Sequence, residues 1–195
     1  MDEREKMING YAYYPDDSKE LYNDRIRVKS LCWEYNNLCP DKINERKKLI
    51  KKIVGKCGAK YFIEPSFQCD YGYNIEIGNN FYSNHNLVIL DCAKVKFGDN
   101  VFVAPNCGFY TACHPINADI RNTGLEYALP ITVGNNVWIG GNVVVLAGVT
   151  IGDNVVIGAG SVVTKNIPSN VIAVGNPCRV LKEITNDIKE KYKVL

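Results

Sequence analysis

Aliphatic residues recur every six positions through the C-terminal half of the chain, between Ile131 and Val174. The first series is Val133, Ile139, Val145, Ile151, Ile157 and Val163, and glycine follows at 134, 140, 152 and 158. A second series keeps the same period four residues later: Val137, Val143, Val149, Val155, Ser161 and Ile167. Neither the 3.6-residue period of a helix nor the two-residue period of a simple strand explains this spacing. A period of six predicts short strands joined by tight turns, as in a parallel β-helix.

The same period runs less regularly through the middle of the chain, starting near Tyr61. It shifts frame once, and its members are Ile77, Ser83 and Ile89, then Phe97, Val103 and Phe109. The turn pattern G-[ND]-N is found at 78–80, 98–100, 134–136 and 152–154. Asparagine and aspartate tolerate the left-handed backbone of tight turns. We therefore expect a mainly β solenoid in which three six-residue units form each triangular coil.

Residues 1–57 follow a different pattern and are expected to form a short helical segment. Apolar residues at helical spacing predict one helix over 18–37. Pro40 and Asp41 mark a turn into a second helix, which Asp41 would cap and which would end at Gly55. Two amphipathic helices before a solenoid are expected to cover the open end of its core, as terminal repeats must.

The six-residue period is interrupted at residues 111–130, a polar stretch that contains His114. Insertions in a solenoid collect on one face, which is often the functional one. The repeat then ends at Gly175-Asn176-Pro177, and a charged tail follows. The expected organisation is a helical segment over 1–57, a β-helix over 58–180 with the inserted loop 111–130, and a helical tail over 181–195.

Composition excludes several classes of protein. The 195 residues carry a net charge of +2 and lack the basic stripe that nucleic-acid binding requires. No apolar run is long enough to cross a membrane, and the N-terminal sequence MDEREKMING lacks the apolar stretch of a signal peptide. We therefore expect neither a nucleic acid nor a membrane as partner, and a cytoplasmic location.

The eight cysteines include no C-x-x-C pair and no zinc-type spacing with the two histidines. The sequence therefore predicts no metal site, and thiols that remain reduced. Cys107 and Cys113 are six apart and extend the repeat register, so both are expected to be small buried residues.

Of the two histidines, one lies where the repeat is interrupted. His114 precedes a proline, which restrains its backbone. An imidazole titrates near neutral pH and can take a proton from a hydroxyl, so His114 is a candidate general base; the alternative is a surface histidine without a function. His85 lies inside a repeat, where a structural role is favoured. The sequence has no G-x-S-x-G motif, no Walker A loop and no dinucleotide-binding loop.

Several motifs together closely resemble the maltose/galactoside O-acetyltransferases, a family of hexapeptide-repeat acyltransferases. They are T-A-C-H-P at 111–115, P-I-T-V-G-N-N-V-W-I-G-G at 130–141, G-A-G-S-V-V-T-K-N-I-P at 158–168 and G-N-P-C-R-V at 175–180. The N-terminal segment, with W-E-Y-N-N at 33–37, also resembles that of the family. The resemblance covers residues 5–185.

The resemblance implies a left-handed parallel β-helix that assembles as a homotrimer, with acetyl-CoA bound between subunits and no metal. His114 matches the catalytic histidine, which would deprotonate a sugar hydroxyl as it attacks the thioester directly. Gly141 stands where the family usually has serine, so only its amide N–H would remain as a donor to the oxyanion. Trp138 would form an apolar wall near the thioester, or pack in the core.

Further contacts with acetyl-CoA are implied at residues that match the family's motifs: Ala159, Thr164, Lys165, Arg179 and Lys182. A small residue such as Ala159 lets the pantetheine arm lie against the coil. The basic side chains suit the phosphates of the cofactor. Considered without the resemblance, Lys165 and Lys182 would be solvated surface charges.

The resemblance also implies an acceptor site: Asp16 (or its neighbour Asp17), Asp70, Asn84, Cys92 and Glu126. Asp70 stands where the family often has serine. Cys92 replaces an aspartate of the galactoside-type members, although Asp91 is adjacent. Glu126 would orient His114, contact the acceptor, or be an exposed loop carboxylate. These departures leave the identity of the acceptor open.

The leading hypothesis is an acetyl-CoA-dependent O-acetyltransferase for a small sugar or glycoside of the maltose, glucose or galactoside type. A second hypothesis keeps the fold and acetyl-CoA but takes an amine, an antibiotic or serine as acceptor. A third is a solenoid binding module without catalysis. The presence of His114 on an intact loop, together with Thr164, Lys165 and Arg179, argues against the third.

Overall fold

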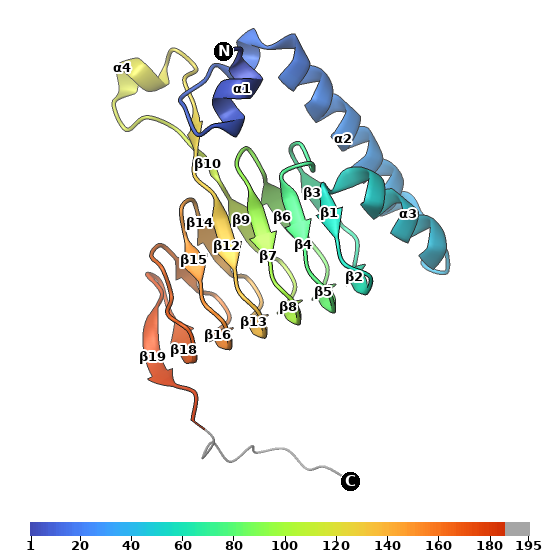
Figure 1. Ribbon diagram of the computed structural model, residues 1–195, viewed down its shortest axis with the longest axis vertical. Helices are drawn as coiled ribbons and strands as arrows, with labels where there is room; N and C mark the ends of the chain where they lie inside the picture. The colour runs from blue at the N-terminus through green and yellow to red at the C-terminus, as the bar shows by residue number, and fades with distance from the viewer. Residues whose placement is uncertain (186–195) are drawn as a thin grey trace.

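Short parallel strands wind into a solenoid with three faces, seen in a computed structural model that describes residues 1–185 (Figure 1). The first sheet stacks β1 (Lys56–Cys57), β4 (Ile75–Ile77), β7 (Val95–Phe97), β12 (Ile131–Val133) and β15 (Thr150–Ile151). The second stacks β2 (Tyr61–Ile63), β5 (Phe81–Ser83), β8 (Val101–Val103), β13 (Val137–Ile139), β16 (Val155–Ile157) and β18 (Val171–Val174). The third stacks β3 (Phe67–Cys69), β6 (Leu87–Leu90), β9 (Gly108–Tyr110), β14 (Val144–Leu146) and β17 (Val162–Val163).

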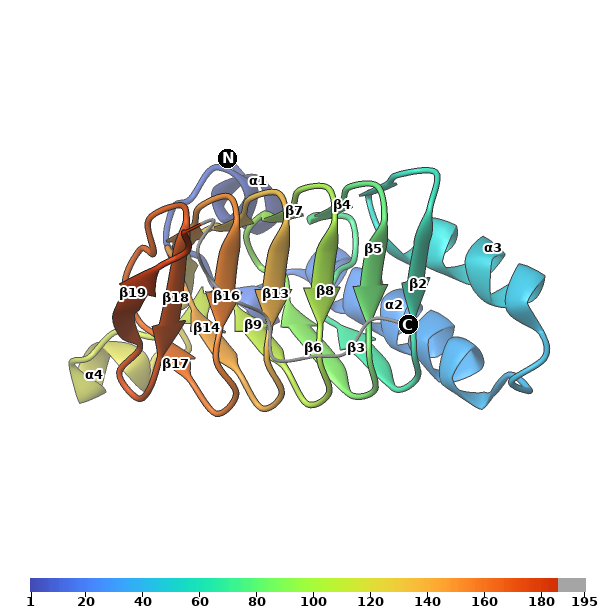
Figure 2. The same cartoon turned by 90° about the horizontal axis from the view of Figure 1, so that it is seen from below.

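Each coil passes from the first sheet to the second, then to the third, and then back to the first sheet of the next coil. We call the turns between these sheets the first, second and third edges of the solenoid. Figure 2 shows strands of the second and third sheets lying side by side along its length. A residue's place in the coil therefore fixes which edge or face it occupies.

The interior of the solenoid is filled by the two predicted series of aliphatic residues. Every member from Val133 to Ile167 is buried, and the earlier series from Ile77 to Phe109 is buried as well. Within β13, for example, Val137 and Ile139 point inward while Trp138 between them points outward. Burial of one such aliphatic side chain stabilises the fold by about 1.5–3 kcal/mol. The prediction of a β solenoid and of its core is confirmed.

The G-[ND]-N turns form the first edge, and close stacking of the coils explains their composition. The third residue has a positive φ, 56° at Asn100 and 57° at Asn136, which asparagine tolerates. Its side chain also bonds along the edge: Asn80 Nδ2 donates to Asn100 Oδ1 at 2.9 Å, and Asn100 Nδ2 to Asn136 Oδ1 at 2.9 Å. At the first position, a Cβ on Gly78 would lie 2.3 Å from the carbonyl oxygen of Gly98, so only glycine fits.

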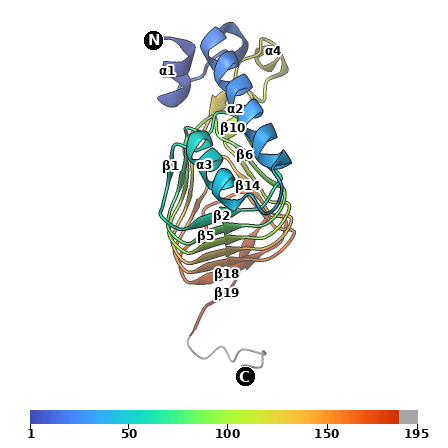
Figure 3. The ribbon, with the colours of Figure 1, turned by 90° about the vertical axis from the view of Figure 1, so that its right-hand side faces the viewer.

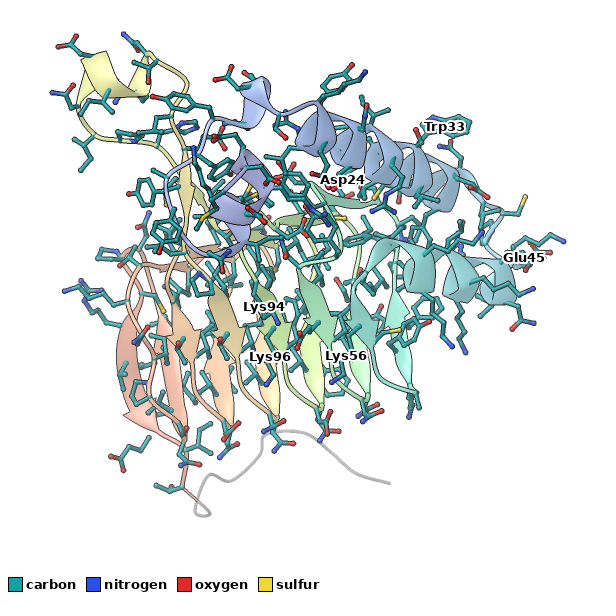
Figure 4. All side chains as sticks on the ribbon, turned by 45° about the horizontal axis from the view of Figure 1, so that its top comes forward. Asp24, Trp33, Glu45, Lys56, Lys94 and Lys96 are labelled. Carbon is teal, nitrogen blue, oxygen red and sulfur yellow. The ribbon has the colours of Figure 1, made fainter. Side chains whose placement is uncertain are left out.

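The N-terminal helices cover the first coil, as predicted. Helices α2 (Lys19–Asn37) and α3 (Ile43–Ile53) pack against the solenoid end in Figure 3. Their residues Val28, Tyr35 and Ile50 belong to the same apolar cluster as the coil interior. The opposite side of α2 faces solvent, where Trp33 is labelled in Figure 4.

Two details of this segment differ from the prediction. Helix α3 starts one residue later than expected and its N-cap is Lys42, so Asp41 does not cap it. A further helix, α1 (Glu3–Ile8), and a single 3₁₀ turn, η1 (Pro15–Asp17), precede α2. The polar sequence of this region gave no periodic apolar signal, because α1 buries only Met7.

The inserted segment 111–130 leaves the solenoid at the third edge, between β9 and β12. Strand β10 (Ala112–Cys113) pairs antiparallel with β11 (Tyr127–Ala128), and α4 (Ala118–Arg121) lies near its tip. Figure 1 shows the tip standing clear of the coils. Cys113 is consequently half-buried on this hairpin, so its predicted place as a buried core residue is wrong, whereas Cys107 is buried as expected.

The described residues after β18 do not form the predicted helix. Residues 181–183 belong to β19 (Arg179–Glu183), which pairs antiparallel with β18. This pairing covers the backbone groups that β18 would otherwise leave open at the end of the second sheet. Residues 184 and 185 have no regular secondary structure, and residues 186–195 of the predicted tail lie outside the described part.

The asparagine ladder leads to a test of stability. Asn100→Ala should lower the melting temperature more than Asn100→Gly, because a left-handed backbone costs a residue with a Cβ about 1–2 kcal/mol. Both variants lose the same side-chain bonds. Asn122→Ala, at a position with a right-handed backbone, serves as control. Equal melting temperatures for the alanine and glycine variants at position 100 would show that backbone strain is not what selects asparagine.

Candidate active site at the inserted loop

His114 directly follows β10 and lies on the inserted hairpin. Pairing of Cys113 with Tyr127 brings the next residues along the hairpin, His114 and Glu126, face to face. The His114 side chain is 54% exposed, and its Nε2 lies 3.9 Å from Glu126 Oε1. The imidazole is thus open to a ligand on one side and faces a carboxylate on the other.

Glu126 is anchored to the N-terminal segment by Tyr13. The two residues exchange backbone hydrogen bonds of 2.9 Å in both directions, and the Tyr13 hydroxyl donates to Glu126 Oε2 at 3.1 Å. The Glu126 side chain is only 21% exposed, so it is not a free loop carboxylate. Tyr13 was not found from the sequence, because nothing local in the polar N-terminal stretch distinguishes it.

Asp70 and Cys92 lie next to each other on consecutive coils at the third edge, below the hairpin. Asp70 follows β3, Cys92 follows β6, and Cys92 Sγ donates to Asp70 Oδ2 at 3.8 Å. Burial raises the pKa of the Asp70 carboxyl, while the charges of Arg25 and Lys29 oppose that rise. Burial and the charge of Asp70 raise the pKa of the Cys92 thiol far above neutrality. The Cys92 thiol therefore stays protonated and donates to the Asp70 carboxyl group.

Asp91 does not replace the missing carboxylate at Cys92, because its side chain turns into the protein. It is fully buried, and Oδ1 accepts the backbone N–H groups of Asp70 at 3.0 Å and Tyr71 at 2.9 Å. Burial raises the pKa of Asp91 to about 7, although these donors oppose the effect. Asp91 thus holds the turn that carries Asp70.

Asp16 approaches from the N-terminal segment. It lies on η1 with its side chain 92% exposed, and Arg25 on α2 reaches it, with Nη2 3.4 Å from Asp16 Oδ1. The charge of Arg25 also acts on Glu126 and on Asp70, which places Asp16 near both carboxyl groups. The structure therefore gathers Asp16, Asp70, Cys92, Glu126 and His114 around the third edge and the N-terminal segment. We call these five residues the histidine half-site.

A second group of predicted residues lies at the second edge. Asn84 follows β5, and its Oδ1 accepts the N–H of His85 at 2.7 Å. Gly141 and Ala159 occupy equivalent turns of consecutive coils, and Gly160 N–H donates to the Gly141 carbonyl at 2.8 Å. The His85 ring contacts the Pro65 carbonyl oxygen, which agrees with a structural role.

Trp138 lies on the outer face of the second sheet, beside this edge. Its side chain is 56% exposed, so packing in the core is excluded as its role. A Cβ added to Gly141 would come no closer than 3.4 Å to Pro105, whereas one on Gly140 would lie 2.6 Å from Ala159 N. Position 141 therefore has room for a side chain and position 140 does not. We call Asn84, Trp138, Gly141 and Ala159 the glycine half-site.

The remaining predicted cofactor residues are all exposed near the C-terminal end of the solenoid. Thr164 and Lys165 follow β17 at the third edge, and Arg179 and Lys182 lie on β19. Arg179 Nη1 donates to the Cys178 carbonyl at 2.8 Å. Within one chain the two half-sites occupy different edges and are not brought together.

Two general features of the described residues bear on the site. Residues 1–185 contain no group of three or more His, Cys, Asp or Glu side chains placed to hold a metal ion. In the same range, no helix has the length and apolar character needed to cross a membrane.

Known protein families match both parts of the chain. Residues 6–58 match the maltose acetyltransferase hexapeptide capping motif, and residues 130–165 match the bacterial transferase hexapeptide repeat. The first match covers the N-terminal helices, and the second covers the coils that carry Trp138, Gly141 and Ala159 of the glycine half-site.

Relatives and solved structures match nearly the whole chain. The galactoside O-acetyltransferase of Escherichia coli is 48% identical over 187 residues, covering 96% of this chain and 92% of the relative. A maltose O-acetyltransferase from Clostridium difficile has a TM-score of 0.94 at 49% identity, with 95% of this chain and 99% of that one covered. A galactoside acetyltransferase in complex with coenzyme A has a TM-score of 0.94 at 45% identity, with 100% and 99% covered.

These similarities agree with the left-handed parallel β-helix expected from the family resemblance. The N-terminal helices, the coils and the inserted hairpin all fall within the range that is shared with enzymes named for acetyl transfer. The chain belongs to the maltose/galactoside O-acetyltransferase family and is an acetyl-CoA-dependent acetyltransferase.

Proposed function

We propose that this enzyme transfers the acetyl group of acetyl-CoA to a hydroxyl of a small sugar or glycoside, with His114 as general base. The observation that carries the proposal is the placement of His114, exposed on a hairpin and facing Glu126. The imidazole takes the hydroxyl proton as the acceptor oxygen attacks the thioester carbonyl carbon. The tetrahedral intermediate collapses, the carbon–sulfur bond breaks, and the imidazolium returns its proton to the leaving thiolate.

The carboxylates of the histidine half-site support a sugar as acceptor. Sugar hydroxyls donate hydrogen bonds to carboxylates, and the histidine half-site holds an exposed Asp16 and a partly buried Asp70. The names of two relatives, galactoside and maltose acetyltransferase, point to the same class. The Cys92 thiol contributes no second carboxylate, so we expect the acceptor to be bound through Asp70 at this turn. The proposed location is the cytoplasm, where acetyl-CoA is available.

The glycine half-site is proposed to hold the reacting end of acetyl-CoA. The Gly141 N–H would donate to the developing oxyanion, and exposed Trp138 would form an apolar wall beside the thioester. Ala159 leaves space for the pantetheine arm. The exposed cations Lys165, Arg179 and Lys182, with Thr164, would meet the phosphates, which attract lysine and arginine.

We further propose a homotrimer, because one chain separates the two half-sites. Asn84 in the glycine half-site would reach the acceptor only from a neighbouring copy. Among residues 1–185 of a single chain, two apolar surfaces are also left partly uncovered. One is the hairpin tip, where Ile116 is 95% exposed. The other is the outer row of the second sheet, in which Phe62, Tyr82, Phe102 and Trp138 lie in register.

Contact between the tip of one copy and the aromatic row of the next would use two different surfaces. Such a contact is heterologous. It generates a closed ring when the rotation from each copy to the next brings the last copy back into contact with the first. In a ring of three, each interface would unite the histidine half-site of one copy with the glycine half-site of its neighbour.

The general base is tested by His114→Ala. Loss of the proton acceptor should lower acetyl transfer by about 10²–10⁴-fold without unfolding the protein. Thiol release from acetyl-CoA, measured across sugars, amines and serine, gives both the rate and the acceptor class. His85→Ala, the other histidine, should keep its activity. Near-normal turnover of His114→Ala would reject the mechanism, and transfer to amines alone would favour the second hypothesis.

The shared site is tested by the assembly state. Sedimentation equilibrium should give three times the chain mass of 21.8 kDa. Ile116→Asp, which places a charge on the apolar tip, should shift the protein toward monomer and lose activity in parallel. Asp119→Lys, also exposed on the loop, controls for a change of charge there. A stable monomer with full activity would refute a site shared between copies.

The oxyanion contact is tested by adding the missing side chain. Gly141→Ser should raise kcat, by up to about tenfold, because a hydroxyl would join the amide N–H as a donor; a full oxyanion donor contributes about 10²–10³-fold. Gly140→Ser is the matched control and should destabilise the protein, because its Cβ would collide with Ala159. A folded Gly141→Ser variant with unchanged or lower kcat would contradict the placement of the oxyanion at this turn.

A further inference from the structure

Tyr13 connects two parts of the chain that lie far apart in sequence, the N-terminal segment and the inserted hairpin. Its ring is completely buried in a small apolar cluster that is separate from the solenoid core. The members of that cluster are Met7, Tyr13, Leu21, Tyr71, Cys92 and Ala128. Since Ala128 belongs to β11 and Cys92 to the coil below, Tyr13 is fixed against both the hairpin and the solenoid.

The contacts of Tyr13 converge on Glu126. Two backbone hydrogen bonds of 2.9 Å align Tyr13 with Glu126 as a short antiparallel bridge. The Tyr13 hydroxyl then donates to Oε2 of the Glu126 carboxylate at 3.1 Å. Burial raises the pKa of this phenol far above its usual range, so the hydroxyl stays protonated and acts as a donor. Both the backbone and one carboxylate oxygen of Glu126 are therefore held in place.

The second carboxylate oxygen of Glu126 faces His114. Oε1 lies 3.9 Å from His114 Nε2, slightly beyond hydrogen-bond distance. Catalytic hydrogen bonds are often long in unliganded enzymes and tighten when substrate binds. A donor–acceptor contact at Nε2 would fix the tautomer in which Nε2 carries the proton and Nδ1 carries the lone pair.

We infer that Tyr13 and Glu126 are positioning residues for His114: Tyr13 orients the Glu126 carboxylate, and Glu126 orients the imidazole with Nδ1 free to accept the acceptor's proton. This inference rests on the proposed role of His114 as base. It assigns the N-terminal segment a part in catalysis that differs from covering the solenoid end. It also separates Glu126 from the acceptor contacts at Asp16 and Asp70.

A double-mutant cycle tests the inference. Glu126→Gln keeps the shape of the side chain but removes its charge, and should lower kcat about 10- to 100-fold with both KM values unchanged. Tyr13→Phe keeps the buried ring and should lower kcat about 3- to 10-fold. In a His114→Ala background, Glu126→Gln should have no further effect, because a residue that acts only through His114 has nothing left to position. Asp119→Asn, a carboxylate-to-amide change on the same loop, should leave kcat unchanged.

Each other outcome overturns the inference in a distinguishable way. A raised acceptor KM in Glu126→Gln, persisting in the His114→Ala background, would show that Glu126 contacts the acceptor. Wild-type kcat in a folded Glu126→Gln variant would show that it has no part in the reaction. If His114→Ala itself kept normal turnover, the proposed base would fail and this inference with it. Thermal unfolding of Tyr13→Phe shows whether a lower kcat comes from a misoriented Glu126 carboxylate or from loss of the fold. If that variant is unstable, the double-mutant cycle of Glu126 and His114 decides alone.

Discussion

Close stacking of one coil on the next is the constraint from which the rest of this structure follows. Parallel strands in adjacent coils are about 4.8 Å apart, and at the first edge that spacing leaves no room for a Cβ on Gly78. Asn100 bonds both to the coil before it and to the coil after it. Because each coil is held by its neighbours in this way, added residues can be accommodated only by leaving the solenoid, as segment 111–130 does.

A segment outside the solenoid needs support that the repeats cannot give. The β10–β11 hairpin is short, and a two-stranded hairpin alone is marginally stable in water. The N-terminal segment supplies the support through Tyr13, which is buried against the hairpin and the coil below it. The same segment uses α2 and α3 to cover the first coil. Two separate apolar clusters in residues 1–185 reflect these two tasks.

The periodic scaffold also distributes the candidate catalytic residues over its edges. Residues one coil apart, such as Asp70 and Cys92, become neighbours, whereas residues at different turns of a coil are directed to different edges. His114 and Gly141 fall into the second class. The geometry of one chain thus favours a site completed by a neighbouring copy. The positively charged outer face of the first sheet, with Lys56, Lys94 and Lys96 in Figure 4, takes no part in either half-site.

The sequence alone determined the solenoid, its buried residues and its turns, since a six-residue period records constraints that act within and between adjacent coils. It also located His114, because the period is interrupted there. The tertiary structure decided the features that the six-residue period does not record. Glu126 meets Tyr13 across 113 positions, Asp91 turns inward beside Cys92, and residues 181–183 extend a sheet where a helix was expected. These outcomes depend on where the chain path brings distant segments together, and no local pattern of residues encodes such a meeting.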